Sequence, residues 1–172
     1  MPLLTGITVS PENPTFHVKG NCLIETATNR LIKGCNTSVI PEYVTSVYDS
    51  AFRACDMESI IIPDSVTSIG QEAFYGCSGL VSVIIGNGVT SIGGSAFAAC
   101  TSLTSITMGA NVTSIGNGAF HDCTSLTSVT IGNDVTSIGE RVFSNCTSLS
   151  SITISDSVTS IGYEAFRGCT GL

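Results

Sequence analysis

The sequence predicts a β-rich solenoid, a right-handed superhelix of stacked coils with one parallel sheet and short helical turns on the opposite side. The first observation is a phrase, Val-Thr-Ser-(Ile/Val) followed by Phe and then Cys, that returns six times. The second is its spacing, because the first step is 22 residues and every later step is 23. A fixed period of about 20–50 residues is typical of stacked repeats. The recurring positions are Val44, Val66, Val89, Val112, Val135 and Val158; Phe52, Phe74, Phe97, Phe120, Phe143 and Phe166; and Cys55, Cys77, Cys100, Cys123, Cys146 and Cys169.

The composition limits the classes of protein to which the chain can belong. Charged residues make up 11% of the 172 residues and the mean hydropathy is +0.41. The longest apolar runs, such as 60–62, are far shorter than the roughly 20 residues of a membrane span. The apolar residues are dispersed and periodic, so we expect them to form a core and expect no membrane insertion.

The net charge of −7 is placed unevenly along the chain. Residues 1–43 carry equal numbers of acids and bases, whereas residues 44–172 hold the whole excess of acids. A body of that sign repels phosphate backbones, so we expect no nucleic-acid partner.

One coil, beginning at Leu126, illustrates the expected local structure. Leu126, Val129 and Ile131 follow the Leu-x-x-Leu-x-Leu signature of a leucine-rich repeat. Val129 and Ile131 lie two residues apart, so both should point from one side of a strand into the core. Ser128 and Thr130 then face outward.

The rest of the same coil returns the chain to the next strand. Residues 132–134 should form a turn, residues 135–138 should cross the far edge, and residues 140–145 suit a single helical turn. A parallel β-helix with three strands per coil is the alternative fold. Asn and Asp at the turn are expected to bond to their own backbone. The recurring position holds Asp64, Asn87, Ala110, Asn133 and Asp156.

The cysteines are predicted to be buried, reduced thiols that act as small hydrophobes. Six of them share one column, and side chains of coils about 4.8 Å apart run parallel rather than converge as a disulfide requires. No Cys-x-x-Cys pair is present, so we expect no zinc site and no other metal or cofactor. Cys22 and Cys35 lie outside the column and could form a bridge across a hairpin.

Residues 1–43 do not follow the repeat and are predicted to be an N-terminal cap with a β-hairpin and a degenerate first coil. We expect a strand at 7–9, a hairpin around 26–29, and a degenerate coil where 39–44 echoes 61–66. Residues 44–172 should then contain five full leucine-rich repeats plus a truncated sixth.

The last coil has no successor in this sequence, which predicts self-association through its apolar residues as a dimer or filament. The predicted self-association end consists of Val158, Ile161, Phe166, Cys169 and Leu172.

No set of residues has the spacing of a catalytic site, so the sequence predicts no enzyme and no catalytic residue. His17 and His121 are the only histidines and lie in different regions. The outward side of the strands is the expected protein-binding surface. This sheet face consists of Ser59, Ile61, Ser82, Ile84, Ser105, Thr107, Ser128, Thr130, Ser151 and Thr153. A second regular row, the Thr-Ser pair after each column valine, allows the alternative of ice or glycan binding.

The repeated phrase resembles the BspA-like class of bacterial leucine-rich repeats. The phrase is Val-Thr-Ser-Ile-Gly-x-x-Ala-Phe-x-x-Cys-(Thr/Ser)-x-Leu-x-Ser-(Val/Ile)-x-(Ile/Met), and it stands nearly intact at 66–85, 89–108 and 112–131. The resemblance implies a surface protein that binds host matrix proteins, other cells or its own kind. It therefore predicts a non-enzymatic interaction or scaffold module for cell-surface adhesion or protein recognition, with a self-associating building block as the alternative.

The resemblance also implies an extracellular or cell-surface location. Residues 1–10 lack a basic start and a long apolar run, so this sequence shows no signal peptide, and a cytoplasmic location stays open.

Overall fold

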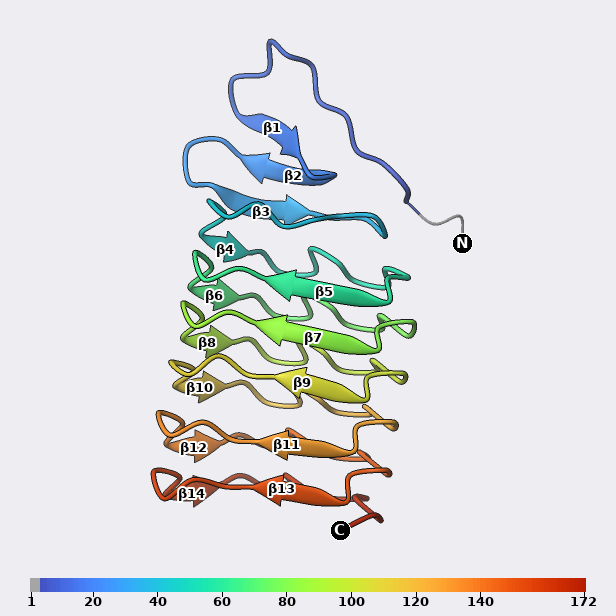
Figure 1. The fold of residues 1–172 in the computed structure, drawn as a ribbon, viewed down its shortest axis with the longest axis vertical. Coiled ribbons are helices and arrows are strands. Elements are labelled where there is room, and N and C mark those ends of the chain that lie inside the picture. The colour runs from blue at the N-terminus through green and yellow to red at the C-terminus, as the bar shows by residue number, and fades with distance from the viewer. Residues whose placement is uncertain (1–3) are drawn as a thin grey trace.

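Coils of about 23 residues stack into one column, as the repeat spacing predicts (Figure 1). The computed structural model describes residues 4–172. Each coil carries a long strand on one side and a two-residue strand on another. The long strands are β5 (Ser59–Ile62), β7 (Ser82–Ile85), β9 (Ser105–Thr107), β11 (Ser128–Thr130) and β13 (Ser151–Thr153). The short strands are β4 (Ser46–Val47), β6 (Ser68–Ile69), β8 (Ser91–Ile92), β10 (Ser114–Ile115), β12 (Ser137–Ile138) and β14 (Ser160–Ile161).

Within each sheet the long strands pair in parallel with a shift of one repeat, so that equivalent residues of successive coils lie side by side. Ser59 pairs with Ser82, and Ser82 with Ser105. Within β11, Ser128 and Thr130 are exposed and Val129 is buried, and Ile131 after the strand is also buried. The predicted inward and outward sets are confirmed.

The prediction of a single sheet was wrong. The long strands form two separate sheets, β5-β7-β9 and β11-β13, and the short strands form a third of nine strands together with the amino-terminal hairpins. Residues 135–138 therefore do more than cross the far edge, because Ser137 and Ile138 pair with the equivalent residues of β14. A coil of this length leaves backbone groups on both sides that only neighbouring coils can satisfy.

The prediction of a helical turn at 140–145 was also wrong, and residues 4–172 contain no helix. Arg141 and Asn145 adopt left-handed backbone angles, with φ of 54° and 60°, which a right-handed helix does not allow. Alternate N–H groups of this segment bond to the next coil, as Phe143 does to the carbonyl of Ala165 at 2.9 Å. The N–H groups between them bond within the coil, as Ser144 does to Arg141 at 3.1 Å. Glycine occupies the same left-handed positions in other coils, at Gly118 and Gly168.

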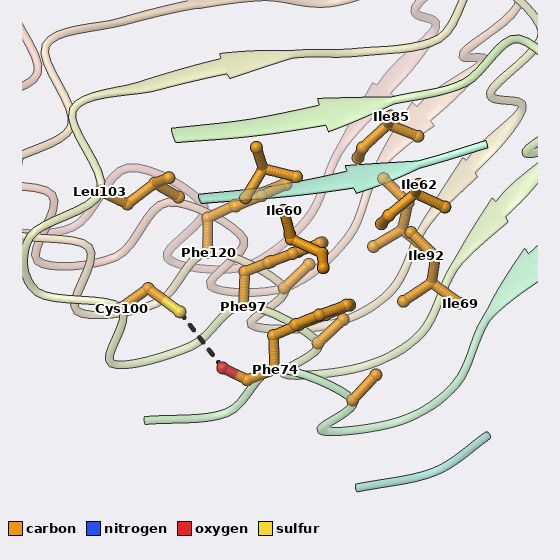
Figure 2. Close-up of a cluster of buried hydrophobic side chains, with 14 of the residues drawn as sticks. Ile60, Ile62, Ile69, Phe74, Ile85, Ile92, Phe97, Cys100, Leu103 and Phe120 are labelled. Atoms are coloured by element: carbon orange, nitrogen blue, oxygen red, sulfur yellow. Dashed lines mark hydrogen bonds between the residues drawn. The ribbon is translucent and has the colours of Figure 1, made fainter. Parts of the chain in front are cut away.

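The core is built around the phenylalanine column. Neighbouring rings are nearly parallel, at 2° to 7°, and their centroids lie 4.9 to 5.7 Å apart. Figure 2 shows Phe74, Phe97 and Phe120 in a row, facing isoleucines of the long strands. Phe166 is the one member that is only partly buried. Identical residues at each level thus form one continuous hydrophobic core.

The column cysteines from Cys55 to Cys146 are buried, as predicted, and Cys169 is half-buried. They are more than small hydrophobes, because each thiol from Cys77 onward donates to the carbonyl of the phenylalanine in the preceding coil at 3.0 to 3.2 Å. Figure 2 draws the bond from Cys100 to Phe74. Burial raises the pKa of the Cys146 thiol to about 12, which keeps the donor protonated.

The amino-terminal segment differs from the prediction in two places. No strand forms at 7–9, so that prediction was wrong, because these residues find no neighbouring strand to pair with. The hairpin around 26–29 is confirmed between β2 (Cys22–Glu25) and β3 (Arg30–Lys33). An additional hairpin joins β1 (Phe16–Lys19) to β2 through 20–21, where both residues take left-handed angles typical of a two-residue turn.

The last strand of this segment joins the solenoid directly. β3 pairs in parallel with β4, so the hairpins extend the sheet of short strands. Cys22 and Cys35 are both free and buried, so the bridge considered between them is not formed. The thiol of Cys22 instead lies 3.5 Å from the carbonyl of Gly20.

Candidate binding surfaces

The ten residues of the predicted sheet face form outward rows, and these rows are divided into two blocks. Nine of its ten residues are exposed, and Ser82 is half-buried. The first block aligns Ile61, Ile84 and Thr107 across β5, β7 and β9. The second block aligns Thr130 with Thr153 across β11 and β13, and no strand pairing joins the two blocks.

The interruption between β9 and β11 coincides with a change in the turn column. Asp64 accepts the backbone N–H of Asn87 at 2.7 Å, and Asn87 accepts that of Ala110 at 2.9 Å. Ala110 has no side-chain oxygen to offer Asn133 in the next coil. A hollow of about 480 Å³ opens at this step, between residues 106–110 and 130–133.

These bonds also correct the prediction for the turn column. Asp64 and Asn87 were expected to bond to their own backbone, but their side chains bond to the coil that follows. Asp49 and Asn117 do the same on the side of each coil that carries the column phenylalanine and cysteine, here named the Phe–Cys side. Each accepts the N–H of the residue 22 or 23 positions later. The short side chains therefore tie coils together rather than stabilise single turns.

The amino-terminal end of the sheet face is apolar. Val39 is 70% exposed, Ile61 63% and Ile84 48%. A hollow of about 270 Å³ lies between β5 and residues 38–42 and is lined by Val39, Ile61 and Glu42. Val39 lies outside the face predicted from the sequence, although the echo of 61–66 in 39–44 places it in the row of Ile61 and Ile84.

A polar hollow of about 500 Å³ lies on the Phe–Cys side, over the coils that contain His121, Glu140 and Arg141. Glu164 accepts hydrogen bonds from Arg141 at 2.7 Å and from Arg167 at 3.4 Å. The hydrogen bond from Arg141 lowers the pKa of Glu164, so the carboxylate stays charged beside the two guanidinium groups. The opposite charges are thereby paired within the protein.

The run His121-Asp122-Cys123 does not form a catalytic group. The Nε2 atom of His121 lies 3.0 Å from a carboxylate oxygen of Asp122, while the Cys123 side chain points into the core. Burial raises the pKa of the Cys123 thiol, which disfavours the nucleophilic thiolate.

The threonine row on the far side bonds to the protein itself. The hydroxyl of Thr90 donates to the carbonyl of Thr67 at 3.1 Å, and that of Thr113 to Thr90 at 3.0 Å. Thr159 donates in the same way to Thr136. These donors satisfy backbone groups between coils, so they are not available to a surface ligand.

The residues of the predicted self-association end lie in the last coil, around β14. Ile161 is 53% exposed and Leu172 56%, whereas Val158, Phe166 and Cys169 are half-buried. The five residues therefore share one end of the column but differ in exposure.

The described residues form neither a metal-ligand cluster nor a membrane-spanning helix. Among residues 4–172, no three His, Cys, Asp or Glu side chains come together as a metal site. The same residues include no helix with the length and apolarity that a membrane crossing requires.

Comparison with known proteins connects this geometry to a family. A family model described as "BspA type Leucine rich repeat region" matches residues 45–172 in six copies. No curated protein sequence matches the chain.

Three solved structures share the fold with appreciable sequence identity. A leucine-rich cell surface protein from Faecalibacterium prausnitzii is 30% identical, with a TM-score of 0.74 over 94% of this chain and 54% of its own. A leucine-rich repeat protein from Eubacterium ventriosum is 27% identical, with a TM-score of 0.72 over 95% of this chain and 52% of its own. A third, from Bacteroides ovatus, is 36% identical, with a TM-score of 0.59 over 77% of this chain and 40% of its own. The chain spans about half the length of these proteins, or less.

Proposed function

The chain belongs to the BspA-type leucine-rich repeat family, and from this premise we propose that it is a non-enzymatic recognition module of a surface protein, which acts in adhesion or protein binding through its sheet face. The Faecalibacterium relative is described as a cell surface protein, which supports an extracellular or cell-surface location for this chain. Leucine-rich repeat solenoids commonly present an extended surface to a partner.

The observation that carries this proposal is the block of uncharged outward side chains on β5, β7 and β9. Ser59, Ser82 and Ser105 form one row, and Ile61, Ile84 and Thr107 form the next, with no charged residue among them. Because these exposed side chains carry no charge, another protein can cover them without burying an unpaired charge. The Phe–Cys side differs because its arginines and carboxylates are paired with each other.

The experiment measures binding of the purified chain to immobilised host extracellular-matrix proteins and to intact cells. Thr107→Arg and Thr130→Arg place a bulky charge on the face and should weaken binding by about tenfold or more, which equals about 1.4 kcal/mol. Gln71→Arg is the matched control, because Gln71 is exposed on the Phe–Cys side. Equal weakening by all three substitutions, or no binding to any of these surfaces, would contradict the proposal.

A second candidate function is self-association of the isolated chain of residues 1–172. The exposure of Ile161 and Leu172 in the last coil supports it. Light scattering over a concentration series should then show a dimer or larger species that Leu172→Asp dissociates. A monomer at tens of micromolar with both sequences would dismiss this candidate.

A further inference from the structure

We propose that the amino-terminal end of the sheet face, the apolar–acidic site formed by Val39, Ile61, Ile84 and the surrounding carboxylates, binds an extended protein segment with aliphatic side chains flanked by Lys or Arg. This proposal rests on the proposed function and names the class of partner for one part of the sheet face.

The first argument is the change in chemistry along a single row. Val39, Ile61 and Ile84 occupy the positions that Thr107, Thr130 and Thr153 occupy in later coils. All are outward-facing, so the later coils show that a hydroxyl suffices there for stacking. The large apolar side chains are not required by the fold, and three adjacent ones form a patch that favours an apolar contact.

The second argument is the hollow beside the patch. It measures about 270 Å³ and lies between β5 and residues 38–42, with Val39, Ile61 and Ser59 in its lining. A hollow with apolar walls can surround an inserted side chain on several sides. It therefore favours an aliphatic residue that enters it over one that only touches a flat surface.

The third argument concerns backbone groups at the same place. β5 is the edge strand of its sheet. The carbonyls of Glu58 and Ile62 accept hydrogen bonds from the β7 side, from Val81 and Gly86. Because backbone groups alternate along a parallel strand, those of Ser59 and Ile61 point to the opposite edge, toward the hollow. They offer donors and acceptors to an extended backbone that lies beside the patch.

The fourth argument is charge. Glu42 lines the hollow, and Asp56, Glu58 and Asp64 lie within three residues of β5 along the chain; all four are exposed. None of the four takes part in a salt bridge among residues 4–172. The only base in 36–87 is Arg53, which is paired with Glu72 on the Phe–Cys side.

The cap adds one base at this border, because Lys19 precedes Gly20, whose carbonyl accepts the N–H of Val39. The segments that form the patch and its border thus carry four exposed carboxylates and one ammonium group. Such an excess attracts a basic partner and repels an acidic one, which gives selectivity that the apolar contact alone does not provide.

The test uses the purified chain and three short synthetic peptides in a fluorescence anisotropy titration at low and high salt. The first peptide has two isoleucines separated by one serine, with lysines on both sides. The second replaces the lysines with glutamates, and the third replaces the isoleucines with serines. Only the first should bind, and its affinity should fall as salt is raised.

Variants then locate the binding. Ile61→Ser and the double change Glu42→Lys with Glu58→Lys should each weaken binding of the first peptide by about tenfold. Thr107→Ile extends the apolar row and should strengthen it. Thr153→Ser, in the same row at the far end of the face, is the matched control and should leave it unchanged. These side chains are all exposed, so a thermal melt should find every variant folded.

Equal binding of the three peptides, no binding of the first, or binding that Ile61→Ser leaves unchanged would overturn this inference. The proposed function fails separately. If Thr130→Arg abolishes binding to matrix proteins while Ile61→Ser does not, the recognition module stands and its partner binds elsewhere on the face.

Discussion

The Phe–Cys side and the strand side of the solenoid respond differently to the same step in the stack. Between the coil of Phe120 and the coil of Phe143, the Phe–Cys side keeps its bonds, with Gly118 donating to Glu140 at 2.8 Å and Phe120 to Val142 at 2.9 Å. At the same step on the strand side, β9 and β11 do not pair (Figure 1). One side is continuous, and the other is interrupted.

The difference shows which positions of the repeat hold coils together. On the Phe–Cys side, each coil repeats the same ring and the same thiol, so every step has the same contacts. On the strand side, the turn column supplies a side-chain oxygen at Asp64 and Asn87 but not at Ala110. A missing hydrogen-bond acceptor at one step affects only the two coils that meet there, because each coil contacts only its neighbours.

The largest expected effect comes from a substitution that disrupts the ring column on the Phe–Cys side. Phe120→Ala removes a fully buried ring with a stacked neighbour on each face, and should lower the free energy of unfolding by about 3–5 kcal/mol. Phe166→Ala should cost clearly less, because Phe166 is half-buried and stacks on Phe143 alone. Denaturant melts of the two variants measure the difference, and equal losses would contradict the stacked-column account.

A second effect concerns the thiols of the continuous side at high pH. Burial raises the pKa of Cys55 to about 11 and that of Cys146 to about 12, against 9.0 for an unperturbed thiol. The unfolded chain therefore loses these protons first, so the stability is full below pH 9 and falls as the pH rises toward 12. Denaturant melts between about pH 8 and pH 11 should show this decline.

Two variants separate the buried thiols from other groups that titrate in this range. Cys146→Ala removes a fully buried thiol and should make the decline shallower. Cys169→Ala removes a half-buried one and should change the slope less. A stability that does not depend on pH, or identical slopes for the two variants, would show that the column thiols are not protected from ionisation.

The smallest expected effect comes from a substitution that adds a hydrogen-bond acceptor on the strand side. Ala110→Asn supplies a side-chain oxygen that can accept the backbone N–H of Asn133, as Asn87 accepts that of Ala110. The added hydrogen bond should stabilise the protein by about 1 kcal/mol. Hydrogen exchange should slow at the amides of β11 at the same time. Asn87→Ala, which removes an existing acceptor, should destabilise by a similar amount and serves as the control. An Ala110→Asn variant that exchanges as fast as the parent would assign the interruption to another cause.

Much of the fold was predictable because the repeat places equivalent residues at equivalent positions. The phenylalanine and cysteine columns, the burial of Val129 and Ile131, and the hairpin at 26–29 all follow from spacing and local turn residues. The hairpin at 20–21 could also have been predicted, because Gly-Asn accepts the left-handed angles of a tight turn. It was missed because the run from Phe16 to Glu25 was interpreted as one strand.

The candidate site was only partly predictable. The outward rows follow from alternation along each strand, and Ile61 and Ile84 stand out in the sequence as apolar members. The echo of 61–66 in 39–44 indicates the place of Val39 in the row, whereas the hollow beside β5 depends on how residues 38–42 pack against the first long strand. That packing is set by contacts between segments about 20 residues apart, which no local pattern encodes.

The sequence by itself determined the architecture, the composition of the core and the outward rows, because a constant period forces identical residues into columns. The tertiary structure alone decided where each polar group finds its partner. The thiol of Cys100 donates to Phe74, and the side chain of Asn87 accepts from Ala110, in bonds that span 26 and 23 residues. Buried and edge backbone groups must be satisfied by whatever lies one coil away. At Asn87 the side chain supplies such a bond to the next coil, and at Ala110, where β9 and β11 do not pair, the side chain supplies none.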